Sequence, residues 1–186
     1  GFKTITTQDT ADTITLGSGV TTAQTVDMED GNDTINAEAA TGAITFTFDT
    51  ESELDGNDTI TGGTGTDILE ITFAGSGSVT AAEMGGVTKV ETIKSATNAI
   101  GSLVLADTNN VSSTITVDVT KNTSAAFTLD ASNEDDGNVT FKGGGGVDTV
   151  TGTAKNDTIS GNDGADVITG GKGADTITGG AGADVF

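Results

Sequence analysis

The sequence of 186 residues lacks cysteine, proline, histidine, arginine, tryptophan and tyrosine, and these absences exclude several classes of chemistry. Without histidine or cysteine there is no Ser-His-Asp triad, no Cys-His dyad, no zinc site built on those side chains and no disulfide. Without arginine, and with a formal net charge of −21, nucleic acid is a poor partner because phosphate binding needs a basic patch. No apolar run reaches the roughly 20 residues of a membrane-spanning helix. We therefore expect a non-enzymatic chain with no nucleic-acid partner and no membrane span.

Aspartate and glycine are the abundant residues with chemical meaning. Of the 28 acidic residues 20 are Asp, and another 28 residues are Gly. Carboxylates and main-chain carbonyls are hard oxygen ligands, which suit Ca²⁺ better than other common metal ions. The composition therefore indicates that several Ca²⁺ ions are the cofactors of this chain.

A nine-residue repeat occupies the last part of the sequence. Residues 143–186 read GGGGVDTVT, GTAKNDTIS, GNDGADVIT, GGKGADTIT and GGAGADVF, with Asp sixth and a large apolar residue eighth in each copy. The phrase GGTGTDILE at 62–70 matches it, and DGNDTIT before it, DGNDTIN at 30–36 and ADTIT at 11–15 are weaker copies. The aspartates at the sixth position are Asp148, Asp157, Asp166, Asp175, Asp184, Asp67, Asp58, Asp33 and Asp12.

The repeat has the pattern of a short strand that follows a tight turn. The last four residues of each copy alternate polar and apolar, which is typical of a strand with one inward side chain, and the glycines before them can adopt positive φ. One apolar residue in nine cannot form a core, but two nine-residue halves that face each other can. We therefore predict an 18-residue coil, with Asp148, Asp166 and Asp184 stacked along one edge and Asp157 and Asp175 along the other.

Stacked aspartates require a counter-charge. Successive coils lie about 4.8 Å apart, so an ion midway between two stacked carboxylates would be near 2.4 Å from each, the usual Ca–O distance. Without metal, two like charges at that separation repel by about 1 kcal/mol in water and several-fold more near a protein surface. Folding is therefore expected to depend on calcium binding.

These repeats resemble the RTX (haemolysin-type calcium-binding) nonapeptide G-G-x-G-x-D-x-U-x, where U is a large apolar residue, and this repeat forms calcium-binding β-helices. The resemblance implies an all-β chain folded as a parallel β-roll or β-helix solenoid. It also implies that each ion takes sixth-position aspartates from two successive coils, here Asp148/Asp166, Asp157/Asp175 and Asp166/Asp184, plus turn carbonyls. Those carbonyls would come from Gly143, Gly144, Gly146, Gly161, Gly164, Gly170, Gly171, Gly173, Gly179, Gly180 and Gly182. Lys155 interrupts the turn before Asp157, which makes that pair the least regular.

The middle of the chain has a different period. Ile93, Leu105, Val117, Leu129 and Phe141 follow one another at intervals of twelve residues, and four of them close short apolar strands. We therefore predict a solenoid with longer turns here, and three regions in all: degenerate repeats over 1–74, the twelve-residue period over 75–142, and the calcium-binding roll over 143–186. Residues 81–84 are expected to form one helical turn before a strand over 87–93.

Two further patterns allow alternatives. The acidic loop 133–138 is either another ion site or a solvated loop. The Thr-Ile-Thr triplets could form a flat threonine face of the kind that ice-binding solenoids present, but ordinary β-propensity explains them better because their spacing in sequence is irregular.

The leading hypothesis is a calcium-binding structural module of a secreted bacterial surface or matrix protein, such as an S-layer, filament or adhesin. An opening strand at residues 2–5 and an incomplete last repeat at Phe186 favour self-association or continuation into a longer solenoid. One alternative is the carboxy-terminal roll of a type I-secreted enzyme or toxin, and another is a non-catalytic module that contacts surface polysaccharide. All three place the protein outside the bacterial cell or on its surface.

Overall fold

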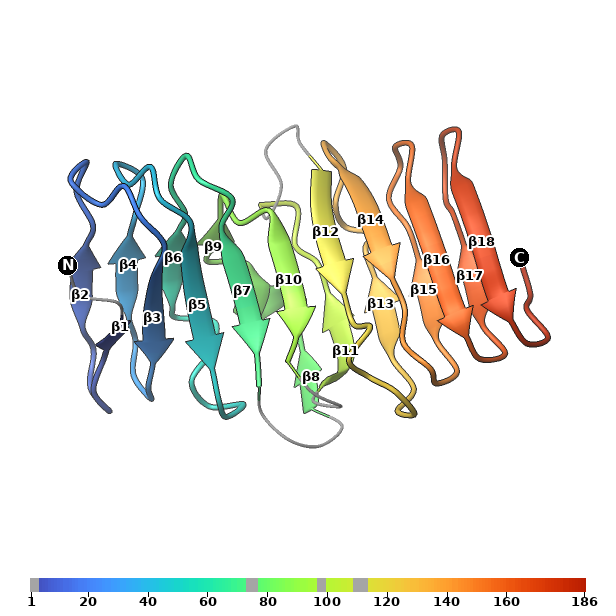
Figure 1. Cartoon of the computed structure of the whole chain (residues 1–186), viewed down its shortest axis with the longest axis horizontal. Helices are drawn as coiled ribbons and strands as arrows, with labels where there is room; N and C mark the ends of the chain where they lie inside the picture. Colours follow the sequence, from blue (N-terminus) through green and yellow to red (C-terminus); the bar gives the residue numbers. More distant parts are fainter. Residues whose placement is uncertain (1–3, 73–76, 97–99, 109–113) are drawn as a thin grey trace.

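The chain winds into one elongated parallel β-solenoid whose strands lie in two facing layers (Figure 1). A computed structural model describes residues 4–72, 77–96, 100–108 and 114–186, so residues 2 and 3 of the predicted opening strand lie outside it. All strand pairs inside the sheets are parallel, as expected when each strand returns to its layer after one full coil. The predicted all-β solenoid is confirmed.

The front layer is a single sheet with one strand from every coil. Its order along the solenoid is β1 (Thr4–Thr6), β3 (Gln24–Met28), β5 (Ile44–Phe48), β7 (Ile68–Ile71), β10 (Thr92–Ser95), β12 (Thr114–Asp118), β14 (Asn138–Lys142), β16 (Thr158–Asp163) and β18 (Thr176–Ala181). Thr140 pairs with Thr158 and Thr158 with Thr176, so each coil of the last region contains 18 residues as predicted.

The back layer consists of two shorter sheets. One holds β2 (Thr13–Thr15), β4 (Thr34–Asn36), β6 (Thr59–Thr61) and β9 (Val87–Thr88); the other holds β8 (Gly77–Val79), β11 (Ile100–Val104), β13 (Thr128–Asp130), β15 (Thr149–Thr151) and β17 (Val167–Thr169). Because β8 pairs forward with β11 and β9 pairs backward with β6, the back layer is interrupted at this point.

Between β8 and β9 lies α1 (Ala81–Met84), the short helical turn that the sequence predicts. Its start is capped on both sides: the Thr80 hydroxyl accepts from Glu83 N–H, while the Glu83 carboxylate accepts from Thr80 N–H. Met84 is fully buried beneath it. The predicted continuous strand over 87–93 is wrong, because Lys89 takes φ +54 and turns the chain from β9 in the back layer to β10 in the front layer.

The apolar core runs between the two layers and is continuous along the described chain. Ile93 pairs with Val117, Val117 with Phe141, and Phe141 with Ile159, so one buried row crosses from the 24-residue coils into the 18-residue coils. The rings of Phe127 and Phe141 stack across this core with centroids 5.9 Å apart. The twelve-residue period therefore does continue the solenoid.

The twelve-residue period fails at one place on the back layer. It predicts Leu105 as the partner of Leu129, but Leu103 holds that position and Leu105 follows the end of β11 as a buried residue. The physical reason is turn length. The turn after β12 is two residues longer than the turn after β10, so an equal spacing in sequence does not give an equal register.

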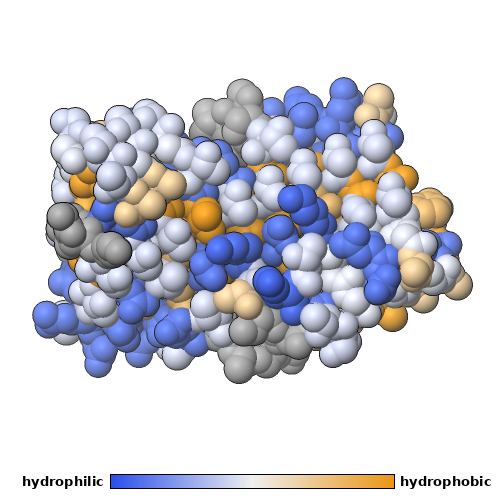
Figure 2. Space-filling view, viewed as in Figure 1, coloured by the Kyte–Doolittle hydropathy of each residue, from blue (hydrophilic) through white to orange (hydrophobic). Residues whose placement is uncertain are grey.

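Threonine forms a nearly unbroken row on the outer face of the front sheet. Paired positions along this row are Thr4, Thr25, Thr45, Ile68, Thr92, Thr116, Thr140, Thr158 and Thr176. A parallel row carries charges at its centre, where Lys94 pairs with Glu70 at 2.9 Å and Lys142 with Asp118 at 3.8 Å. Figure 2 shows this face as mostly pale, with hydrophilic side chains across its middle. The spacing in sequence therefore understates how regularly the threonines align in space.

Truncating the stacked core ring tests this architecture. Phe141→Ala is expected to lower the free energy of unfolding in saturating calcium by about 3–5 kcal/mol, because it leaves a cavity between the layers. Urea titration followed by circular dichroism measures this change. Thr158→Ala, an exposed position on the same sheet, is the control and should change little. An equal effect of both substitutions would contradict the assigned core.

Candidate metal centre

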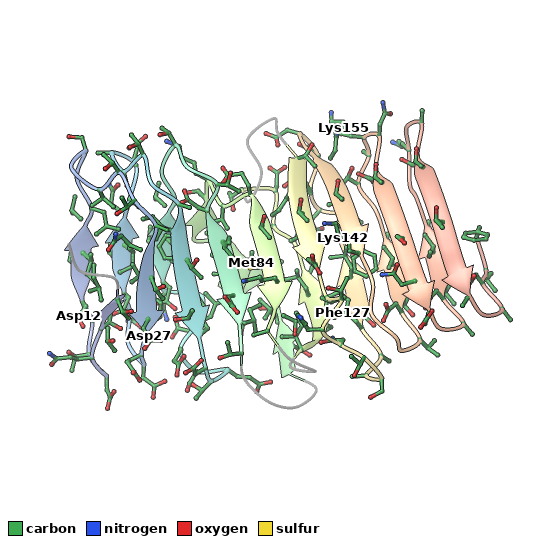
Figure 3. The ribbon with its side chains drawn as sticks, in the orientation of Figure 1. Asp12, Asp27, Met84, Phe127, Lys142 and Lys155 are labelled. Carbon is green, nitrogen blue, oxygen red and sulfur yellow. The ribbon has the colours of Figure 1, made fainter. Side chains whose placement is uncertain are left out.

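The sixth-position aspartates lie where the chain passes between the layers. We call the turns that lead from a front strand to a back strand the front-to-back edge, and the opposite turns the back-to-front edge. Asp148 and Asp166 immediately precede the back strands β15 and β17, whereas Asp157 and Asp175 precede the front strands β16 and β18. In Figure 3, Asp12 marks the front-to-back edge near the N-terminal end, and Lys155 marks the back-to-front edge.

A repeated hydrogen bond links the aspartates of successive coils. Asp148 N–H donates to Asp166 Oδ1 at 2.8 Å, and Asp166 N–H donates to Asp184 Oδ1 at 3.1 Å. On the other edge Asp157 N–H donates to Asp175 Oδ1 at 2.9 Å. The expected stacking on two edges is therefore observed, and each carboxylate is held by the main chain of the coil before it.

The degenerate repeats form the same kind of ladder at the other end of the molecule. Asp12 N–H donates to Asp33 Oδ1 at 2.9 Å, and Asp33 N–H donates to Asp58 Oδ1 at 2.8 Å. Asp33 and Asp58 are buried. The structure thus brings all three aspartates together on the front-to-back edge, although 21 and 25 residues separate them in sequence.

Asp67 has a stacked partner that the repeat pattern does not contain. Asp67 N–H donates to Glu91 Oε2 at 2.7 Å, which is the ladder bond with glutamate in place of aspartate. Glu91 precedes β10 as Asp67 precedes β7, and it lies two residues before Ile93 as Asp67 lies two before Leu69. That spacing is the signal that could have identified Glu91.

The second carboxylate oxygen of several ladder residues faces its own turn. Gly144 N–H donates to Asp148 Oδ2 at 3.1 Å, and Asp55 N–H donates to Asp58 Oδ2 at 2.8 Å. Two ladder oxygens, Asp166 Oδ2 and Asp33 Oδ2, are instead buried without any hydrogen-bond partner. A buried carboxylate oxygen without a partner is costly, and a cation can provide the missing interaction.

The glycines of the turns leave room beside these oxygens. A Cβ atom added to Gly161 would collide with Asp166 Oδ2 and also approach the carbonyl oxygen of Gly179 in the next coil. The equivalent spaces at Gly143 and Gly152 lie between the Oδ2 atom of Asp148 or Asp157 and a carbonyl oxygen one coil on. Carboxylate and carbonyl oxygens thus converge at the turns, and this donor set fits calcium.

The remaining predicted turn glycines have related geometry. Positive φ occurs at Gly164, Gly171, Gly173, Gly180 and Gly182. Close approach to a main-chain carbonyl of a neighbouring coil occurs at Gly144, with Asn122, and at Gly146, with Ala125. Gly170 and Gly179 instead lie against the Oδ2 atoms of Asp175 and Asp184. The assignment of these glycine carbonyls as ligands remains a prediction.

The turn before Asp157 differs from the others. Thr153 Oγ1 lies 2.9 Å and 3.2 Å from the two carboxylate oxygens of Asp157, and Thr153 N–H donates to Oδ2 at 2.6 Å. Lys155 is exposed at the surface of this turn. Because protein groups already surround its carboxylate, Asp157 with Asp175 is the least favourable of the three predicted ion pairs of aspartates.

Burial shapes the electrostatics of the ladders. It raises the pKa of Asp148 to about 6, and it also raises the pKa of Asp58, Asp67 and Glu91. Hydrogen bonds from main-chain N–H groups oppose each of these shifts without cancelling them. Without a cation, the folded chain therefore holds these carboxylates in an environment that disfavours their charge.

Side chains alone do not form a complete metal shell. Within residues 4–72, 77–96, 100–108 and 114–186, no three His, Cys, Asp or Glu side chains converge on one point. Since calcium takes six to eight oxygen ligands, main-chain carbonyls and water would have to supply most of them. The same ranges contain no helix long and apolar enough to cross a membrane.

Comparison with known families gives one match. The model of the RTX calcium-binding nonapeptide repeat matches four copies, over residues 54–70, 135–154 and 151–186. These segments include Asp58, Asp67 and the five aspartates from Asp148 to Asp184, but not Asp12, Asp33 or Glu91. No curated protein and no solved structure matches the chain.

The raised pKa of Asp148 predicts how pH affects the calcium-free protein. Its folded pKa, about 6, exceeds the model value of 3.8, so the protonated acid favours folding. This contribution is complete below about pH 4 and is lost as the pH rises through about 6. In calcium-free buffer, urea titrations should therefore show greater stability at pH 4 than at pH 7. Asp148→Asn should reduce the difference, and greater stability at pH 7 would contradict the prediction.

The ladder order predicts unequal losses of calcium. Asp166 bonds to the coils on both sides, whereas Asp148 has a ladder aspartate on one side only. Asp166→Asn should therefore remove two ions per chain and Asp148→Asn one, as counted by native mass spectrometry in calcium. Loss of the same number of ions from both variants would contradict ions shared between successive aspartates.

Proposed function

We propose, from the premise that this chain is an RTX-repeat protein, that it is a calcium-binding structural module of a secreted bacterial surface or matrix protein. In this proposal calcium binds after export, the chain then folds, and further coils or chains join it end to end. An S-layer, a filament or an adhesin is the kind of assembly that such a module would serve.

The observation that supports the proposal most directly is the set of acidic ladders at both edges. They occur near both ends of the solenoid, at Asp12–Asp58 and at Asp148–Asp184, with Asp67 and Glu91 between them. Since the net charge is −21, metal-free coils repel one another where these carboxylates stack. A cation that joins two coils turns the repulsion into a link, so calcium would control when the coils assemble.

Such control suits a protein that must leave the cell before it folds. Where calcium is scarce the repulsion favours an extended chain, and where calcium is abundant the ladders close. This reasoning supports a secreted or cell-surface location and export through a type I channel. It applies equally to the carboxy-terminal roll of a secreted enzyme or toxin, which is the alternative proposal.

The edges of the front sheet support continuation into a longer assembly. β1 and β18 each have one strand neighbour only, so each end of the stack presents main-chain groups that another strand can pair with. Near β18, Val185 and Phe186 are 58% and 72% exposed. An apolar surface beside an open sheet edge favours contact with a further solenoid coil.

We also propose that the module has no catalytic activity of its own. The chain contains no His, Cys, Arg or Tyr, which excludes most hydrolytic and group-transfer sites. Contact with surface polysaccharide through bound calcium remains a secondary proposal, and glycan binding with and without calcium would test it.

The proposal predicts calcium-dependent folding and association. In millimolar calcium the chain should show β-sheet circular dichroism and concentration-dependent assembly by light scattering, and excess chelator should abolish both. Val185→Lys should reduce assembly without reducing the calcium-dependent circular dichroism, because it places a charge on the exposed end. A calcium-bound chain that stays monomeric at high concentration would contradict end-to-end association, whereas a folded chain in excess chelator would contradict calcium control.

A further inference from the structure

We propose that Glu134 and Asp136 form a further calcium site, outside the nonapeptide pattern, in the turn between β13 and β14. The turn comprises residues 131–137 and lies on the back-to-front edge, next to the turn that carries Asp157. The proposal rests on the calcium dependence proposed above, and it assigns an ion to residues that the repeat motif does not include.

Glu134 is a completely buried acid with an unused oxygen. Its Oε1 atom accepts from Gly137 N–H at 2.9 Å and from Asp136 N–H at 3.3 Å, and its exposed fraction is 0%. Its Oε2 atom is buried and has no hydrogen-bond partner. The carboxyl group of Asp136 is a hydrogen-bonding neighbour of Glu134, so the two acids face each other at this turn.

The unused oxygen has the same property as the predicted calcium ligands. In the described part of the chain, the buried side-chain polar atoms without a partner are Gln24 Oε1 and three carboxylate oxygens. Two of those carboxylates, Asp33 and Asp166, belong to the ladders, and the third is Glu134. Glu134 therefore resembles the ladder positions in burial and in unmet bonding, although it lies at no sixth position of the repeat.

No side-chain cation compensates Glu134 in the described residues. The ion pairs found there join Lys89 to Glu38, Lys94 to Glu70 and Lys142 to Asp118. The nearby Lys155 acts instead on Asp135, whose carboxyl group lies beside that of Asp107 in the preceding coil. The loop thus adds acids around Glu134 without adding a base that pairs with it.

Two facing carboxyl groups can persist in a buried turn either by sharing a proton or by binding a cation. Burial raises the pKa of Glu134 to about 7, against the bond from Gly137 N–H, and Asp136 adds to the rise. A divalent cation that displaces the shared proton satisfies Glu134 Oε2 and removes the repulsion. The exposed side of Asp136 leaves space for water, and calcium accepts water together with carboxylate and carbonyl oxygens.

Ion counting on the whole chain tests the proposal. Glu134→Gln keeps an oxygen that can accept from Gly137 N–H but removes the charge, so it should bind one calcium ion fewer than the natural sequence. Asp135→Asn removes the same charge from the adjacent exposed residue and should keep every ion. Native mass spectrometry in calcium gives the counts, and circular dichroism in saturating calcium shows that each variant is folded.

Asp136→Asn provides an independent check, because the exposed Asp136 can be replaced even if Glu134→Gln does not fold. It should lose the same single ion. If Glu134→Gln or Asp136→Asn binds as many ions as the natural chain, or if Asp135→Asn also loses one, the site is wrong and Glu134 is a protonated structural acid. If the natural chain binds no calcium, the proposed function itself is contradicted, which is a distinguishable result.

Discussion

The contact between a carboxylate and the main chain of the preceding coil is the interaction on which this solenoid depends. The same bond, from the N–H group of one acidic residue to the carboxylate one coil later, recurs at Asp33, Asp58, Glu91, Asp166, Asp175 and Asp184. It fixes the register at both edges, where short strands alone provide few bonds. It also brings negative charges within one strand spacing of each other, which couples the geometry of the fold to a cation.

Calcium and the thin core have complementary roles. Each coil of the last region contributes only one apolar side chain to each layer, such as Phe141 followed by Ile159 on the front sheet. Apolar burial of this size is small, and the ladders add a repulsion that metal must remove. The buried acids outside the motif, Glu91 and Glu134, extend this arrangement into the middle of the chain, where the family match is incomplete.

Sequence reasoning predicted the regular parts of the fold and failed where the coil length changes. The 18-residue coil, the two ladder edges and the helical turn at 81–84 were all accessible, because each follows from a local period or composition. The partner of Leu129 was not, because two extra residues in a distant turn move Leu103 into the place expected for Leu105. The turn at Lys89 was also missed, since no local signal indicates a positive φ at lysine.

By itself, the sequence determined the chemistry and the phase of this protein. Abundant aspartate with no histidine or cysteine leaves oxygen coordination as the available metal chemistry, and the fixed distance from Asp to the following apolar residue places each carboxylate at a turn. Only the tertiary structure decided which acids meet. Asp12, Asp33 and Asp58 are separated by unequal intervals, and Asp67 joins Glu91 across a shortened turn. The physical reason is that strand pairing sets the spacing between coils, while turns of different length absorb the variation in sequence.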